Sequence, residues 1–250
     1  MNTQPPHRTL RSWVYETLRE RIIAGDLAPG EALVEAHLAT ELGISRSPIR
    51  EALRQLGQDG LVVTLPNSAT TVSSMDAFDI DQVFEVRDLL ESCLIAHAAI
   101  ARTSEELSQC ANLVSLMPDV ASREDIRQYA DLDGQFHSLL WQMAKRPIVT
   151  ETLLPIADRA RRYLSLSSRA LHSESRKTLL VSYEEHRRIF SAIEQCDVAE
   201  AVSATRDHMS LSRKRILHSF GRLKEGNATA SDTRAVKPLA YTITWTEGEL

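Results

Sequence analysis

The chain has 250 residues, 43% of them hydrophobic and 25% charged, and its formal net charge at pH 7 is −5. This length allows a small domain and a second domain with its own core, and the acidic balance predicts that the second domain is not a nucleic-acid surface. No stretch approaches the ~20 apolar residues of a membrane-spanning helix, and the polar N-terminus lacks a signal-peptide run, so we expect a cytoplasmic protein that does not bind membranes.

Two helices are predicted before residue 43. The first lies in VYETLRERIIAGDLAPGEAL and ends at Gly25. The second lies in AHLATELGIS, with Leu38 and Leu42 on its apolar face, and it stops at Gly43 because glycine readily adopts the left-handed conformation that ends helices. The next helical pattern follows directly, so the sequence predicts two helices joined by a tight turn.

A helix with one apolar and one cationic face is predicted in the segment GISRSPIREALRQLGQDGLV. Either Ser45 or Ser47 can cap its start, and proline is tolerated in the first turn because its missing N–H would have no acceptor there. Arg46, Arg50 and Arg54 follow at i, i+4 and i+8 along one side, while apolar residues on the other side can pack into a small core. Such a helix can enter a DNA groove; the alternative is a surface helix with solvated arginines.

Two short strands joined by a turn are predicted in LVVTLPNSATTVS, and they would form a β-wing beside the cationic helix. With this order of elements, residues 11–72 closely resemble the winged helix-turn-helix of GntR-family transcription regulators, above all in SRSPIREAL and the following Gly60-Leu61-Val62. Where that family usually has a glycine at the wing tip, this chain has Ser68-Ala69. We place the DNA-binding domain at residues 8–75.

The resemblance implies that Arg46 and Arg50 contact DNA, with Ser45 and Ser47 near phosphates or base edges. The first 75 residues carry about as many acidic as basic side chains. Attraction to phosphates must therefore come from a local stripe, to which Arg54 also belongs, rather than from a basic domain. We expect modest affinity per monomer, and hence a homodimer on a palindromic operator in double-stranded DNA.

From residue 76 onward the 3.6-residue apolar period predicts six helices. They are expected near residues 76–102, 104–117, 123–145, 147–170, 174–195 and 197–221, with one break at Pro118-Asp119. Such a set closes as an antiparallel bundle, whose core commonly holds a ligand or metal. The predicted fold class is therefore mainly α, with a winged helix-turn-helix and an all-α bundle over residues 76–222. Residues 223–250 are expected to form a flexible tail.

Four polar residues interrupt the apolar stripes of three predicted helices. Asp133 and His137 lie one turn apart in YADLDGQFHSLLW, and His186 and His208 each lie on a later helix. A single histidine on such a stripe is more often a hydrogen-bonded core residue. One carboxylate and three neutral imidazoles would nevertheless suit a divalent cation of the zinc, nickel or manganese class, with positions open to water or ligand oxygens.

The region 76–221 resembles the FCD ligand-binding domain of the FadR subfamily, in its shorter, VanR-like variant. The motifs that carry the resemblance are VFEVRDLLES, DLDGQFH and EEHRRIFSAI. In metal-binding members the aspartate and the three histidines are the ligands, so the resemblance implies a metal at the four positions named above. The chain has Lys145-Arg146-Pro147 where the family often has an asparagine.

Arg87 allows two interpretations. Glu91 follows it at i+4, so the two side chains can form a structural ion pair. Alternatively, the guanidinium of Arg87 faces the pocket and grips the carboxylate of a small organic acid effector, which is the role the resemblance favours. Arg159 and Arg162 could add charge to the same cavity, or could be solvated or lie at a dimer interface.

Three functions are compatible with these features. The first is a transcription regulator, not an enzyme: a repressor that a small carboxylate effector releases from DNA. The second is a metal-dependent hydrolase, since an Asp/His shell with open positions can activate water, although no spare inward carboxylate suggests a general base. The third is a constitutive DNA-binding dimer in which the metal is only structural.

Overall fold

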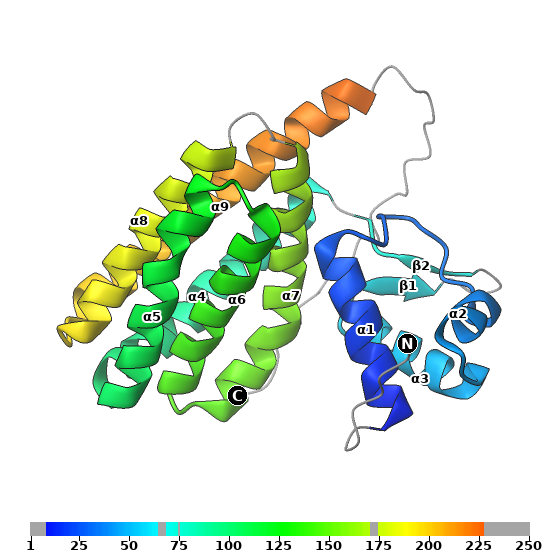
Figure 1. The fold of residues 1–250 in the computed structure, drawn as a ribbon, viewed down its shortest axis with the longest axis horizontal. Coiled ribbons are helices and arrows are strands. Elements are labelled where there is room, and N and C mark those ends of the chain that lie inside the picture. Colours follow the sequence, from blue (N-terminus) through cyan, green and yellow to red (C-terminus); the bar gives the residue numbers. More distant parts are fainter. Residues whose placement is uncertain (1–8, 65–68, 75, 171–174, 228–250) are drawn as a thin grey trace, which may run out of the picture.

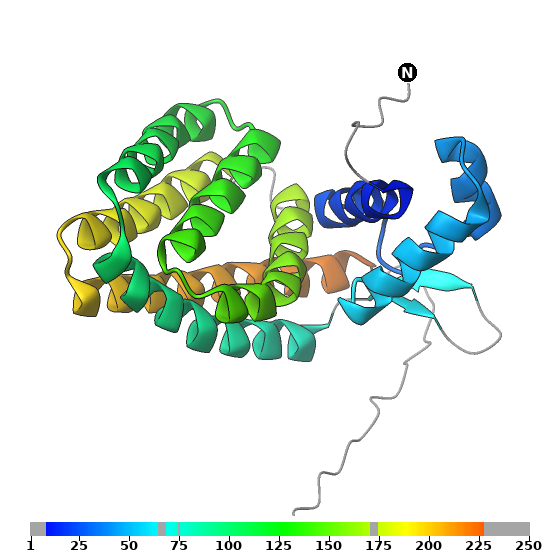
Figure 2. The same cartoon turned by 90° about the horizontal axis from the view of Figure 1, so that it is seen from below.

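The computed structural model of the chain describes residues 9–64, 69–74, 76–170 and 175–227. Within these ranges nine helices and one small sheet form two lobes, a winged helix-turn-helix and a helical bundle (Figures 1 and 2). The predicted fold class is confirmed. None of the described helices is long and apolar enough to cross a membrane.

The N-terminal lobe has the predicted order of elements. They are α1 (Leu10–Ala24), α2 (Glu35–Leu42), α3 (Arg46–Gln58), β1 (Val62–Thr64) and β2 (Thr70–Val72). Gly25 and Gly43 end α1 and α2 in the left-handed conformation, with φ of 76° and 67°. The two strands pair antiparallel, with Val62 opposite Val72. Ser68, at the predicted wing tip, lies outside the described residues.

The core of this lobe fixes the orientation of α3. Ile49, Leu53 and Leu56 are at most 4% exposed and pack with Val14 and Leu18 of α1. Because the apolar face of α3 is buried in this way, its opposite, cationic face is left at the surface. The amphipathic pattern in the sequence therefore determines which side of α3 is available to a partner.

The C-terminal lobe contains the six predicted helices. They are α4 (Ala77–Ala101), α5 (Ser104–Ser122), α6 (Ile126–Met143), α7 (Pro147–Ala170), α8 (Ser175–Glu194) and α9 (Val198–Asn227). The predicted break at Pro118 is wrong, since α5 continues through it for one further turn. Proline costs that turn one backbone hydrogen bond, but Met117, Val120 and Ala121 are at most 2% exposed and hold it in the core.

The C-terminal end of the bundle also differs from expectation. Helix α9 runs to Asn227, past the predicted end at 221 and into the segment expected to be a flexible tail. The remainder of that predicted tail, from residue 228, lies outside the described residues. Helix α7 is the part of the bundle that lies against α1 of the other lobe (Figures 1 and 2).

Candidate metal centre and DNA-binding helix

The exposed side of α3 carries the side chains predicted to contact DNA. Ser45, Arg46, Ser47, Arg50 and Arg54 are all exposed. Ser45 is the N-cap residue, but its side chain makes no capping hydrogen bond. Its hydroxyl therefore remains free for an outside partner at the positive end of the helix dipole, where a phosphate is stabilised.

Arg50 has a partner that the sequence did not suggest. Its Nε lies 3.1 Å from Oε1 of Glu35 and its Nη2 lies 2.9 Å from Oε2, while the Arg50 side chain is 70% exposed. The hydrogen bond from Arg50 lowers the pKa of the Glu35 carboxyl. Ion pairs this exposed are weak, so Arg50 can exchange Glu35 for a DNA phosphate or base at little cost.

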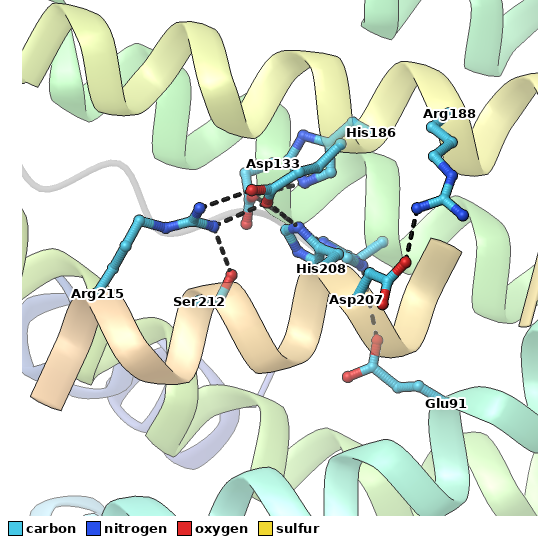
Figure 3. A network of polar contacts seen from close by, with 10 residues as sticks. Glu91, Asp133, His186, Arg188, Asp207, His208, Ser212 and Arg215 are labelled. Carbon is cyan, nitrogen blue, oxygen red and sulfur yellow. Dashed lines mark hydrogen bonds and ion pairs between the residues drawn. The ribbon is translucent and has the colours of Figure 1, made fainter. Parts of the chain in front are cut away.

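The bundle brings together the four predicted metal ligands from α6, α8 and α9. His137, His186 and His208 are buried, and each offers a nitrogen within 4.8 Å of the others. Oδ1 of Asp133 lies 3.3 Å from Nε2 of His186 and 4.0 Å from Nε2 of His137. Figure 3 shows Asp133, His186 and His208 converging on one point between their helices.

His186 is the residue whose surroundings best test whether a metal fits. It is fully buried, and neither of its ring nitrogens has a hydrogen-bond partner, although Asp133 lies close to Nε2. An unpaired buried nitrogen is costly, and native proteins rarely leave one unexplained. A divalent cation among three imidazoles and a carboxylate would use such a nitrogen, so these residues fit the metal that the sequence predicted.

The protonation states suit metal binding. Burial lowers the pKa of His137 to about 3 and that of His208 to about 4, so both imidazoles are neutral at physiological pH, as a metal ligand must be. Burial acts to raise the pKa of Asp133, but the adjacent imidazoles of His186 and His137 outweigh it and hold that pKa well below its usual range. Asp133 is therefore ionised.

A supporting carboxylate, missed in the sequence, positions one of the imidazoles. Oε2 of Glu185 lies 2.8 Å from Nδ1 of His208, and Arg215 donates to both oxygens of Glu185 at 2.7 and 2.8 Å. Burial opposes ionisation of Glu185, but Arg215 and His208 lower its pKa to about 2. An ionised carboxylate on one nitrogen orients the ring so that the other can bind a metal. The signal was available, since Glu185 directly precedes His186.

Arg87 combines features of both interpretations. Its Nε donates to Oε1 of Glu91 at 2.6 Å, and the two side chains are 6% and 0% exposed, so the ion pair exists. The Arg87 side chain also lines a cavity of about 40 Å³ beside the histidines. The lining residues are Arg19, Arg87, Asp133, Gly134, His137, Ser138, Trp141, Leu154, Ala157, Asp158, Arg161, Leu164 and His208. The role of Arg87 toward an effector stays a prediction.

Arg159 and Arg162 do not line this cavity. Arg159 Nε donates to the carbonyl oxygen of Asp59 at 3.0 Å, and Arg162 donates to the carbonyl oxygen of Ser73. Both arginines therefore bind the winged-helix lobe. The sequence had suggested instead a place in the cavity, in solvent or at a dimer interface. The arginines of the cavity besides Arg87 are Arg19 and Arg161. Arg19 could not be predicted from the sequence, because it belongs to the other lobe.

Comparisons with known proteins agree with both lobes. Residues 10–72 match the model of the bacterial regulatory proteins of the gntR family, and residues 82–211 match the FCD domain. An uncharacterized HTH-type transcriptional regulator in an unstable DNA locus of Streptomyces ambofaciens is 31% identical over 210 residues, which cover 81% of this chain and 83% of that protein. The HTH-type transcriptional repressor RspR of Escherichia coli K12 is 28% identical, over 82% of this chain and 87% of that protein.

Two solved structures share the fold. The E. coli McbR/YncC structure has a TM-score of 0.77 at 22% identity and covers 85% of this chain and 99% of its own. A GntR regulator from Rhodococcus sp. RHA1 has a TM-score of 0.70 at 22% identity, over 83% of this chain and 97% of that one. At this identity the two structures support the two-lobed fold and carry no information on ligands.

Proposed function

This chain belongs to the GntR family of bacterial transcription regulators and carries an FCD domain, and from this premise we propose that it is a repressor controlled by a small carboxylate. Its family and relatives are DNA-binding transcriptional regulators and not enzymes, which removes the hydrolase considered from the sequence. The carboxylate would bind at a divalent metal held by the bundle. The observation that carries this proposal is the buried three-histidine cluster, in which Nδ1 of His186 has no hydrogen-bond partner and Nε2 has only Asp133, itself one of the proposed ligands, nearby.

Repression, as opposed to activation, is supported by the name of one relative. RspR of E. coli K12 is named a transcriptional repressor, and its similarity to this chain extends over both lobes. By analogy this chain would block transcription when bound to its operator. An effector that binds one arrangement of the lobes more tightly than the other would then shift the protein off the operator.

In the bundle, we assign His137, His186, His208 and Asp133 as metal ligands. Three imidazole nitrogens and one carboxylate oxygen suit zinc, nickel or manganese. When bound, the metal would supply a Lewis-acidic centre for an oxygen of the effector. Arg87 would hold the same carboxylate through charge-assisted hydrogen bonds, while its pairing with Glu91 fixes where the guanidinium lies.

In the winged-helix lobe, α3 would lie in the major groove. Arg46, Arg50 and Arg54 would face bases and phosphates, and Ser45 and Ser47 would bind a phosphate at the helix N-terminus. Their common exposure and the burial of the opposite face of α3 support this orientation.

We assign the homodimer contact to one face of α4. That face carries four exposed apolar side chains, which are Phe78 (70% exposed), Val86 (39%), Leu89 (68%) and Ile100 (69%). Large apolar side chains gathered on one helix face mark a protein–protein contact. Leu89→Arg should yield a monomer in light scattering, whereas Leu116→Arg, at an exposed leucine of α5, should stay dimeric. A dimeric Leu89→Arg would place the contact elsewhere.

The effector proposal is tested by thermal melting of the full-length protein with a panel of hydroxy acids, sugar acids and dicarboxylates, before and after the metal is removed with a chelator. A ligand that binds only the folded state raises the melting temperature by mass action. We expect one class of acid to stabilise the protein only when metal is present. A metal that stabilises the protein while no acid does so would favour the constitutive DNA-binding dimer with a structural metal.

A further inference from the structure

The cavity beside the histidines is bounded by both lobes. Asp133, His137 and His208 form its wall on the side of the metal ligands, whereas Asp158 comes from α7 and Arg19 comes from α1 of the winged-helix lobe. A residue of the DNA-binding lobe therefore lies at the edge of the proposed effector site.

Arg19 and Asp158 join the two lobes by a bidentate ion pair. Arg19 Nε donates to Oδ2 of Asp158 at 2.5 Å, and Nη2 donates to Oδ1. Asp158 is 4% exposed, and the side chain of Arg19 is 19% exposed. A carboxylate is thus the group that Arg19 already binds, in the planar two-bond geometry that guanidinium groups prefer. A second carboxylate of suitable reach could replace it.

Arg161 is a second cation on this wall, and its charge acts on Asp158 without a direct ion pair. Its side chain lies against Gly134, where a Cβ atom would come within 3.1 Å of its Cζ. No hydrogen bond or salt bridge joins Arg161 to another residue in the described ranges. The cavity is lined by three arginines and by Asp133 and Asp158, and Glu91 pairs with Arg87, so a divalent metal at the histidines would leave the site with a surplus of positive charge.

The size of the cavity determines where it must open. Its volume of about 40 Å³ is roughly that of one or two water molecules in the liquid. An organic acid can enter only if a wall moves. The wall between α1 and α7 is closed by the Arg19–Asp158 ion pair, which a competing carboxylate can replace, whereas the wall on the side of α6 is anchored in the apolar core by Phe136 and Leu140.

We propose that Arg19 is a ligand-binding residue of this cavity and that its ligand is a dicarboxylate, whose second carboxylate replaces Asp158 on Arg19. The proposal rests on the function proposed above, since the first carboxylate would lie at the metal and Arg87. Arg161 would add a donor to the second carboxylate. Because Arg19 lies on α1, binding of the diacid directly changes the contact that holds the DNA-binding lobe against the bundle.

The test is calorimetric titration of the full-length, metal-loaded protein with malonate, succinate and glutarate, each compared with the monocarboxylate of the same chain length. Wild-type protein should bind one diacid more tightly than its monoacid. In Arg19→Gln that diacid should bind roughly 10- to 100-fold more weakly, while the monoacid is unaffected. Asp158→Asn should bind the diacid more tightly, because Arg19 then keeps only the longer contact to the more exposed Glu16, at 3.8 Å from Nη1.

The opposite signs of the two variants separate ligand binding from a structural role. If the ion pair only held the lobes together, both variants would change affinity in the same direction, and that result would overturn the proposal. Arg21→Gln is the control, since Arg21 lies on the same helix but pairs with Glu41 of its own lobe at 2.9 Å. Asp158→Asn remains informative if Arg19→Gln fails to fold.

Two titration outcomes separate the role of Arg19 from the effector site itself. If diacids and monoacids bind wild-type protein equally and Arg19→Gln changes neither, the effector site stands and the role of Arg19 is wrong. If no acid binds the metal-loaded wild-type protein, the effector site and the inference are both wrong.

Discussion

The two polar sites of this molecule differ in how they are held. The cationic face of α3 is exposed, and Arg50 there has one weak, exchangeable partner in Glu35. The histidine cluster is buried between α6, α8 and α9, and its members are fixed by packing and by carboxylates such as Glu185. Under the proposed function, the face of α3 that binds a large polyanion can remain loose until DNA arrives, whereas the cluster that binds a single cation must be built in advance.

The largest effect on binding is expected from removing one of the proposed metal ligands of the buried histidine cluster. His186→Ala should reduce affinity for the divalent metal by more than the ~10- to 100-fold that loss of a supporting partner costs, because a direct ligand is removed. Metal content after dialysis and calorimetric titration of metal into the stripped protein would measure this. His218→Ala, at an exposed histidine of α9, should bind metal as the wild type does. Unchanged metal binding in His186→Ala would refute the assigned ligand set.

The next effect is expected at the exposed site. Arg50→Ala should weaken operator binding by roughly 10- to 100-fold, the usual cost of losing an arginine that contacts a base, because the guanidinium is lost from the centre of the cationic face. Gel shifts on the operator would measure the loss. Affinity for the acid effector should not change, since the cavity lies in another part of the molecule. Equal operator binding by both proteins would contradict the proposed orientation of α3.

The contact between the winged-helix lobe and the bundle can be tested by changing Gly60. Its φ is +72°, and a Cβ atom there would overlap the guanidinium of Arg159, which bonds to the carbonyl oxygen of Asp59. Gly60→Ala should therefore lower the free energy of unfolding by about 1–2 kcal/mol, from backbone strain alone, and more if Arg159 is displaced. Gly57→Ala is the control, because that position in α3 has only ordinary contacts at 3.9 Å and alanine favours helix. Denaturant unfolding would reveal whether the two variants differ in sign.

How much of each site could be predicted from the sequence depends on whether its residues lie close together along the chain. The exposed face of α3 lies within one short segment, so its periodicity was enough to place Arg46, Arg50 and Arg54. The six bundle helices and the inward position of the histidines also followed from local apolar periods. Contacts between distant segments could not be predicted in this way. Glu35 approaches Arg50 only through the turn between α2 and α3, and Arg19 meets Asp158, which is 139 positions away, only in the folded chain.

The smallest effect on binding is expected from removing the carboxylate that pairs with Arg50 on the exposed face of α3. Glu35→Gln removes the charge that holds Arg50 but leaves its shape, and exposed pairs contribute little, so operator affinity should rise by no more than about fivefold. The rise should shrink as salt is added, because screening weakens the Glu35–Arg50 attraction in the wild type as well. Gel shifts at two salt concentrations would measure both changes. A large loss of operator affinity would instead mean that Glu35 positions Arg50 for its DNA contact, so that the exposed site, like the buried one, is built in advance.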